Sequence, residues 1–228
     1  MRPLPWCWRQ PTGARWTSCR WNFSSVMPGR MRIERLAALA ALLVAPAFAE
    51  TPDLAGMIRS DDRARLERLD EVAGRTLRSA LALGSPEDRA ILVEGLSGSA
   101  LPAERAMTIL QGEWSCRMLK LGGNLPLVVY QAFHCRLTGS GFEKLTGSQR
   151  TTGRIGLLDG QTVYLGTAFV AGDTPLPYGE LPAEVDPGAT PQLTPEVGLV
   201  EVTGDKAARI LLPLPWLESE LNVLMLTR

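Results

Sequence analysis

The chain has 228 residues, 24 basic and 24 acidic side chains, and 45% hydrophobic residues. This composition fits one globular domain with a short appendage and excludes a collagen-like, fully disordered or polytopic membrane protein. The 17 prolines and 22 glycines are spread along the chain without a repeat, which favours a turn-rich fold over a helical bundle or a solenoid.

Residues 31–49 have the three parts of a secretory signal peptide. A basic start at Met31–Arg35 precedes an apolar run, and the segment ends in the small-x-small pattern Ala47–Ala49. We expect cleavage before Glu50, a periplasmic or secreted protein, and contact with the membrane only transiently through this segment. A membrane anchor is the alternative, but the apolar run has about 14 residues and a spanning helix needs about 20.

Residues 1–30 hold four of the six tryptophans without helical or strand periodicity. Because a signal peptide begins at the N-terminus, we expect an unstructured, over-extended segment here and a translation start at Met27 or Met31. The alternative is a functional arm rich in tryptophan and arginine. Beyond residue 49 the chain has 17 basic and 23 acidic residues, a net charge of −6, so nucleic acid is not an expected partner.

Residues 50–103 are expected to form a helical part. Apolar residues recur at three- and four-residue steps between Ser60 and Leu83, which predicts one amphipathic helix that ends at Gly84. Ser85-Pro86 predicts the start of a second helix, which runs to about Leu96. We expect this helical hairpin to brace the main domain; an arm that binds a partner is the alternative.

Residues 104–228 are expected to form an antiparallel β domain, because short β-rich runs alternate with glycine and proline. The predicted strands are 112–121, 127–138, 143–155, 162–170, 196–203, 208–213 and 221–227. Asp159-Gly160 predicts a tight hairpin, and the proline-rich segment 171–194 predicts a long loop. The predicted fold class is therefore α+β, a helical hairpin followed by an antiparallel β-barrel or strongly curved sheet of seven to eight strands, lipocalin-like in outline.

Cys116 and Cys135 are the only cysteines beyond residue 49, and an exported protein folds in an oxidising compartment, so we expect a disulfide between them. If they face each other across the first hairpin, the residue numbers of each pair sum to 251. Trp114, Met118, Phe133 and Leu137 then point into the barrel, with Lys120 and Gln131 on the same face. Arg117 and Arg136 lie on the other face.

His134 is the only histidine, so a Ser-His-Asp site would have to use it. The chain has no G-x-S-x-G elbow, and one histidine with a disulfide-bonded cysteine pair does not make a zinc site. We therefore expect no catalytic residues, no metal and no cofactor. A hydrolase that uses His134 with Ser148 or Ser219 is the alternative. The polar run 144–153 lacks the spacing of a phosphate loop, and it fits either a half-exposed strand or a ligand site.

Several short motifs over about residues 55–227 contain the residues Cys116, Arg117, Lys120, Cys135, Arg136, Lys144, Gly147, Ser148, Gln149, Arg150 and Glu218. At these residues the chain resembles a bacterial exported family of unknown function, numbered 4893. The family has no assigned activity, so the resemblance implies export, the disulfide and the fold rather than a function.

These observations favour a non-catalytic envelope protein that binds a small ligand or a protein partner. The candidate ligand or anion site consists of Arg117, Arg136, Lys144, Ser148, Gln149, Arg150 and Glu218. We expect the three arginines and Lys144 to converge near one end or face of the sheet. Such a basic cluster needs an anionic ligand or internal carboxylates, for which Glu113 and Glu218 are the candidates.

Overall fold

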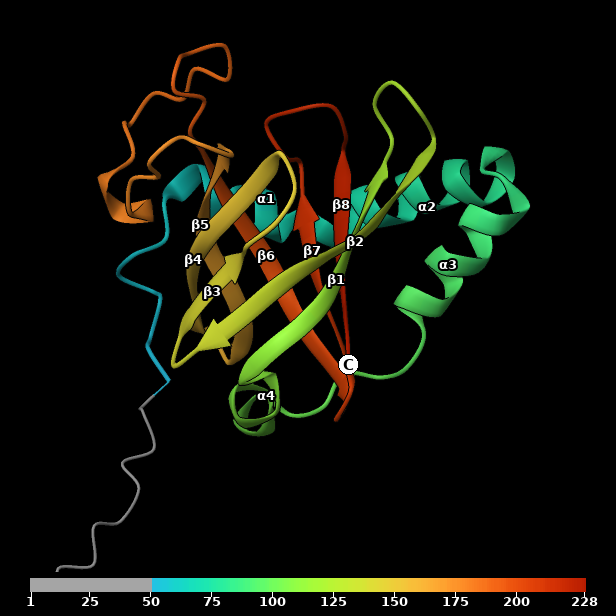
Figure 1. Cartoon of the computed structure of the whole chain (residues 1–228), viewed down its shortest axis with the longest axis horizontal. Helices are drawn as coiled ribbons and strands as arrows, with labels where there is room; N and C mark the ends of the chain where they lie inside the picture. The colour runs from blue at the N-terminus through green and yellow to red at the C-terminus, as the bar shows by residue number, and fades with distance from the viewer. Residues whose placement is uncertain (1–50) are drawn as a thin grey trace, which may run out of the picture. The chain divides into compact units, whose positions relative to one another are not determined.

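The computed structural model describes residues 51–228, in which eight antiparallel strands close into a barrel and four α-helices accompany them (Figure 1). The strands follow one another round the barrel in chain order, and β1 pairs with β8 to close it. The predicted α+β class is confirmed, and of the two predicted alternatives, a barrel or a strongly curved sheet of seven to eight strands, the structure has the closed barrel, with eight strands. The predicted signal peptide and the N-terminal segment 1–30 lie outside the described residues. Within residues 51–228, no helix has the length and apolar character needed to cross a membrane.

The strand bounds follow the alternation of side chains in the sequence closely. The strands are β1 (Gly112–Leu121), β2 (Leu127–Thr138), β3 (Gly141–Lys144), β4 (Gln149–Leu158), β5 (Gln161–Val170), β6 (Thr194–Gly204), β7 (Ala207–Pro213) and β8 (Leu221–Thr227). The single predicted strand over 143–155 was wrong. The chain leaves the sheet after β3 and re-enters it at β4, with Gly147 between them in a left-handed conformation (φ 91°) that an extended strand does not contain.

Two connections have the predicted character. Asp159 and Gly160 both have positive φ, 51° and 81°, as a two-residue hairpin turn of this hand requires. The segment between β5 and β6 is a long loop with one short 3₁₀ helix, η1 (Tyr178–Glu180).

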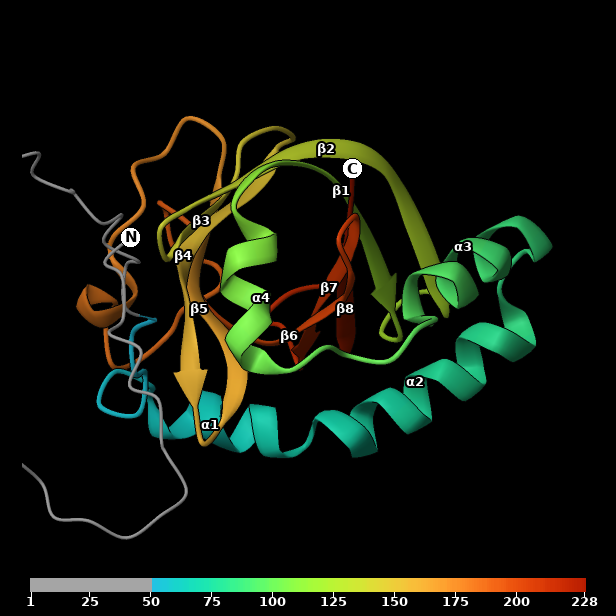
Figure 2. The same cartoon turned by 90° about the horizontal axis from the view of Figure 1, so that it is seen from below.

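One end of the barrel is filled with apolar side chains and covered by α4 (Ala103–Leu110), a helix that the sequence reading did not predict. Figure 2 shows α4 lying across this end. Its Leu110 is 1% exposed, and the carbonyl of Leu110 accepts a hydrogen bond from Trp114 Nε1 at 2.7 Å. Trp114 and Leu137 are buried here, and Met118 and Phe133 pack against the same core, so all four point inward as predicted.

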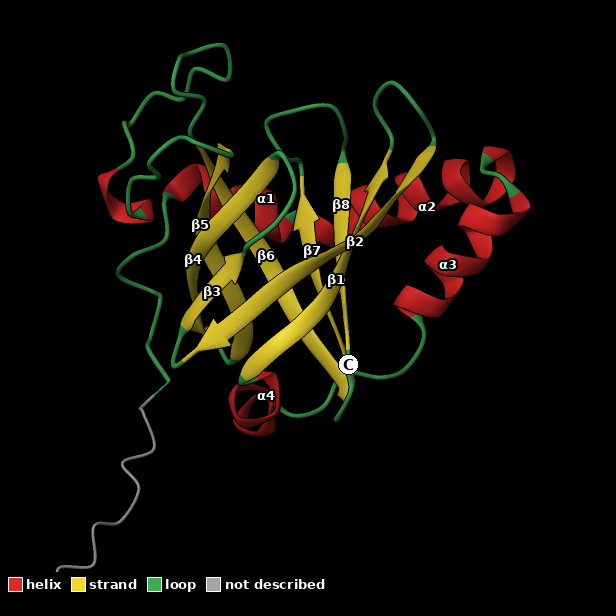
Figure 3. Cartoon of the chain, in the orientation of Figure 1, coloured by secondary structure: helices red, strands yellow, loops and turns green. Residues whose placement is uncertain are grey.

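The remaining helices cover the outside of the barrel wall (Figures 2 and 3). The helix predicted over 60–83 is interrupted at Arg68, which separates α1 (Ser60–Glu67) from α2 (Leu69–Leu83). α1 is anchored by Arg65, which donates to the carbonyls of Pro195 and Pro213. α2 and α3 (Pro86–Leu96) instead pack by apolar contact on outward-facing residues of β1, β2 and β8. The Ser85 hydroxyl accepts a hydrogen bond from the backbone N–H of Asp88 at 3.0 Å.

The predicted disulfide between Cys116 and Cys135 is present, but the predicted register is wrong by two residues. Cys135 lies opposite Trp114, and Cys116 lies opposite Phe133, so the pairs sum to 249. The two cysteines are diagonal neighbours with Cα atoms 5.9 Å apart, a separation that a disulfide spans. Because side chains alternate with a period of two, a shift of two leaves the residues from Gly112 to Arg117 and their partners on the predicted faces. A bulge between Arg117 and Leu119 shifts the rest of the hairpin by one more residue, so Lys120 lies opposite Val128 and not opposite Gln131 as predicted.

Candidate functional site

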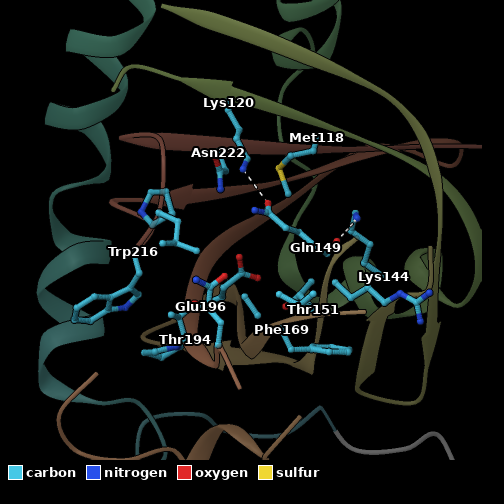
Figure 4. A pocket seen from close by; sticks show the side chains of 17 residues that line it. Met118, Lys120, Lys144, Gln149, Thr151, Phe169, Thr194, Glu196, Trp216 and Asn222 are labelled. Carbon is cyan, nitrogen blue, oxygen red and sulfur yellow. Dashed lines mark hydrogen bonds between the residues drawn. The ribbon is translucent and has the colours of Figure 1, made fainter. Parts of the chain in front are cut away.

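Polar side chains face the interior at the end of the barrel opposite α4. Lys120 on β1, Lys144 on β3, Thr151 on β4 and Asn222 on β8 are each less than a tenth exposed. All four line one chamber, together with Glu196 of β6 (Figure 4). This end of the barrel is therefore a buried polar site, in contrast to the apolar core beside α4.

The site has two connected parts. The inner chamber has a volume of about 60 Å³ and lies inside the barrel. The outer groove has a volume of about 670 Å³ and runs along β2, over residues that include Val128, Tyr130 and Phe133. Met118, Lys120, Lys144 and Gln149 line both parts. A ligand in the groove would therefore contact the same lysines that face the chamber.

The groove exists because β3 is much shorter than its neighbour. β3 pairs with β2 only from Cys135 to Thr138, while β2 continues for eight residues beyond that point, Leu127–His134. Beyond the strand pairing, His134 accepts a backbone hydrogen bond from Leu145, and its own N–H donates to Thr146 Oγ1. One side of β2 therefore borders the groove instead of another strand.

The loop between β7 and β8 lies over the polar end, and we call residues Leu214–Ser219 the lid loop. It contributes Trp216 to the inner chamber and Glu218 to the outer groove. A hydrogen bond from Leu214 N to the carbonyl of Glu220 closes its base at 2.8 Å.

Lys120 joins the barrel wall to the lid loop. Its ammonium group donates to Gln149 Oε1 at 2.9 Å and forms an ion pair with the Glu218 carboxylate. The same ammonium lies 5.5 Å from the centre of the Tyr130 ring. The Lys120 side chain is 9% exposed and the Glu218 side chain is 50% exposed, so the lysine belongs to the interior and the glutamate reaches in from the loop.

Lys144 is held differently. Its ammonium donates to the backbone carbonyls of Thr146 and Gln149 and lies 3.9 Å from the centre of the Phe133 ring. Within residues 51–228 no carboxylate forms an ion pair with it. Burial lowers the pKa of Lys144 from 10.5 to about 8; Glu196 opposes this shift, whereas the positive charges of Arg150 and Lys120 add to it.

The inner chamber also holds two buried polar atoms without a hydrogen-bond partner in the described part of the chain, Glu196 Oε2 and Trp216 Nε1. Burial raises the pKa of the Glu196 carboxyl, and the Thr151 hydroxyl and the cationic side chains nearby oppose that shift. Buried polar groups are normally paired with protein or with water. Glu196 Oε2 and Trp216 Nε1 are therefore a buried acceptor and a buried donor that no group of the described chain satisfies.

The structure brings some of the predicted site residues together. Lys144, Gln149 and Glu218 meet at the groove, Ser148 also lines it, and Arg150 lines the inner chamber. The predicted convergence of the three arginines with Lys144 was wrong. Arg136 is on the outer face, where it pairs with Glu143 at 2.8 Å and Glu113 at 3.9 Å.

The reason is the alternation of side chains along strands. Glu143 and Lys144 are consecutive in β3, so the partner of Arg136 faces outward and Lys144 faces the interior. Arg117 lies between the inward-facing Cys116 and Met118, and it also faces outward. The expected carboxylate partner Glu113 was correct for Arg136, but Glu218 pairs with Lys120 and not with an arginine.

His134 and the two candidate serines do not form hydrogen bonds with one another in the described chain. Of the His134 atoms, only the backbone groups take part in hydrogen bonds. Ser219 Oγ donates to Asn222 Oδ1 at 2.7 Å, and Ser148 is an exposed residue at the groove. No group of three potential metal ligands occurs in residues 51–228.

Several site residues were missed by sequence reasoning. Lys120 could have been included, because it is two and four residues from the inward-facing Met118 and Cys116. Glu196, Trp216 and Asn222 carry no such signal, since they come from distant segments that meet only when the barrel closes.

The family model for a domain of unknown function, DUF4893, matches residues 55–226. The chain belongs to the DUF4893 family. The matched DUF4893 segment includes every residue that lines the chamber and the groove, and the whole lid loop. The comparisons with curated proteins and with solved structures find no match.

Proposed function

We propose that this DUF4893 protein is an exported envelope protein that binds a small ligand at the polar end of its barrel and does not catalyse a reaction. The observation that carries the proposal is the burial of two lysines at the boundary between the inner chamber and the outer groove. Burying a charged group is costly unless the group is paired. Lys144 is buried without an ion pair, so its burial is unfavourable for folding. A charged group in such an environment is typical of a functional site.

The dimensions of the site support a small organic ligand. Pockets that bind small molecules have volumes of about 300–1,000 Å³ and combine apolar walls with a few polar groups. The outer groove, at about 670 Å³, is within this range, and Val128, Tyr130 and Phe133 give it apolar surface beside the two lysines. In this proposal one end of the barrel is covered by α4 and the other admits the ligand, as in a lipocalin.

Two further observations are compatible with the proposal. The disulfide between Cys116 and Cys135 suits an oxidising compartment outside the cytoplasm, in agreement with the predicted signal peptide. The lack of a hydrogen bond between the imidazole of His134 and either candidate serine favours binding over hydrolysis.

The test is a binding screen followed by nuclear magnetic resonance. We would titrate the ¹⁵N-labelled protein with a library of small acids, amines and neutral aromatic compounds. We expect at least one compound to shift the backbone amides of Met118, Lys144 and Gln149 together. Val128→Trp should abolish that response by filling the groove, and Val93→Trp, at an exposed position of α3, should leave it intact.

If no compound shifts these amides, or if Val128→Trp binds as tightly as the unmodified protein, the proposed function is wrong. A compound that is consumed during the titration, with the turnover lost in His134→Ala, would instead support the hydrolase.

A further inference from the structure

Resting on the function proposed above, we infer that the ligand carries a carboxylate on an apolar body, and that Glu218 occupies the position of this carboxylate when no ligand is bound. The lid loop is then a built-in competitor of the ligand. Three features of the molecule support this: the contacts of Glu218, the backbone of the lid loop, and the charges that face the groove.

Glu218 interacts with groups of the barrel wall in the way that a bound carboxylate would. One oxygen pairs with the Lys120 ammonium, and the other lies 3.5 Å from Gln149 Nε2. Both partners belong to strands that line the chamber and the groove. Glu218 comes from the connecting loop and is half exposed. An incoming carboxylate could therefore replace it on Lys120 and Gln149 without any change in the strands.

The backbone of the lid loop is suited to release. Leu214 and Glu218 have φ values of 47° and 66°, which place two residues with side chains in the left-handed region. This conformation costs roughly 1–2 kcal/mol for each such residue. Contacts that include the Lys120–Glu218 ion pair hold the loop in this form. When a ligand pairs with Lys120 in place of Glu218, the ion pair between Lys120 and Glu218 is lost, and the strained backbone favours movement of the lid loop.

The charges that face the groove favour an anion. Lys120 and Lys144 both line it, and within residues 51–228 only Glu218 provides a carboxylate there. A ligand carboxylate that displaces Glu218 would pair with Lys120, and the positive charge of Lys144 in the same lining would add to the attraction of an anion. Val128, Tyr130 and Phe133 would contact an aliphatic or aromatic body.

The competing reading is that Glu218 contacts the ligand directly, for example as the partner of an amine. The two readings differ in the ligand that the unmodified protein prefers, an acid if Glu218 is a competitor and an amine if Glu218 is a partner. Removal of a competitor tightens the binding of an acid, whereas removal of a partner weakens the binding of an amine.

The experiment uses three probes with the same body, 4-phenylbutyrate, its neutral amide and 4-phenylbutylamine. Their dissociation constants are measured by calorimetry at pH 7 on the unmodified protein, Glu218→Gln and Glu220→Gln. Glu220 is the matched control, because it is a half-exposed glutamate that directly follows the lid loop and pairs with Arg75 away from the groove. We expect Glu218→Gln to bind 4-phenylbutyrate about three- to tenfold more tightly, with the amide unchanged.

Melting temperatures establish that each variant is folded. The inference is overturned if the unmodified protein binds the acid and Glu218→Gln binds it equally or less tightly, and the proposed function then stands. It is also overturned if the amine is the preferred probe and Glu218→Gln weakens its binding. If none of the three probes binds any variant, the carboxylate inference fails, and the library screen described above decides the proposed function separately.

Discussion

Lys144→Met should reveal how much the buried ammonium group of the polar end costs the folded protein. The substitution keeps an unbranched side chain of similar length but removes the charge. At pH 7 the lysine is protonated in both the folded and the unfolded protein, and burial makes the folded charged form less favourable, which lowers its pKa from 10.5 to about 8.

The size and the sign of the effect follow from this shift. Each pKa unit is worth about 1.4 kcal/mol, so the shift sets an upper limit of about 3 kcal/mol. The ammonium group borders the outer groove, and solvent screening there should reduce the effect to about 1–2 kcal/mol. Because the folded pKa is the lower one, the cost is complete below pH 8 and disappears as the pH rises towards 10.5. The unmodified protein should therefore gain about 1–2 kcal/mol relative to Lys144→Met between pH 7 and pH 10.5.

Urea denaturation of both proteins at pH 7, 8, 9 and 10 measures this difference. The lost hydrogen bonds to the carbonyls of Thr146 and Gln149 add a constant that does not change with pH. Lys206→Met, at an exposed position, is the control and should show no pH-dependent difference. If the free energies of unfolding of Lys144→Met and the unmodified protein run parallel across this range, the argument from burial is refuted.

Three further substitutions test the fold around the site. Replacing both Cys116 and Cys135 by alanine should lower the free energy of unfolding by about 3 kcal/mol, because a cross-link with a sequence separation of 19 no longer restricts the unfolded chain; a loss below about 1 kcal/mol in urea denaturation would contradict this account. Phe142→Ala should lower the free energy of unfolding by about 3–5 kcal/mol, since the ring is 1% exposed and packs edge-on against Tyr164. Leu83→Ala, at a position that is 72% exposed, is its control and should change the free energy of unfolding by less than about 0.5 kcal/mol. Arg209→Met should speed hydrogen exchange in residues 94–99, because this buried arginine donates to the carbonyls of Gly95, Ser97 and Gly98; unchanged exchange there would show that another contact holds the end of α3.

The parts of the fold that could be predicted are those set by local patterns. Alternation of buried and exposed residues gave the bounds of β1 and β2, and Asp159-Gly160 gave the hairpin between β4 and β5. Features that depend on contacts between distant parts of the chain were harder to predict from the sequence. The sequence contains the polar run 144–153, but only the structure shows that Gly147 interrupts it and separates β3 from β4. The helix α4 follows Pro102 and has only eight residues, fewer than the periodic run over 60–83 from which a helix was predicted.

The candidate site was predictable only in part, for a related reason. Lys144, Gln149 and Glu218 were recognised as polar motif residues, but the face to which each points depends on the pairing of strands. Arg136 has the same charge as Lys144 and lies on the neighbouring strand, yet it belongs to an exposed ion-pair network outside the barrel. The burial of Glu196 beside Asn222 depends on the closure of β8 onto β1, which no local pattern specifies.

Under the proposed function, the shortness of β3, which has only four residues, leaves room for a long ligand to extend beyond the interior of the barrel. Because β3 pairs with β2 only over its four residues, the barrel wall is open beside the rest of β2 at the polar end. We call this opening the notch. A molecule whose head group reaches the inner chamber can extend sideways through the notch and along β2. Chain length beyond the notch would then add contact with β2 without requiring a larger chamber. A homologous series of ligands should accordingly gain affinity gradually with length instead of reaching a sharp size limit.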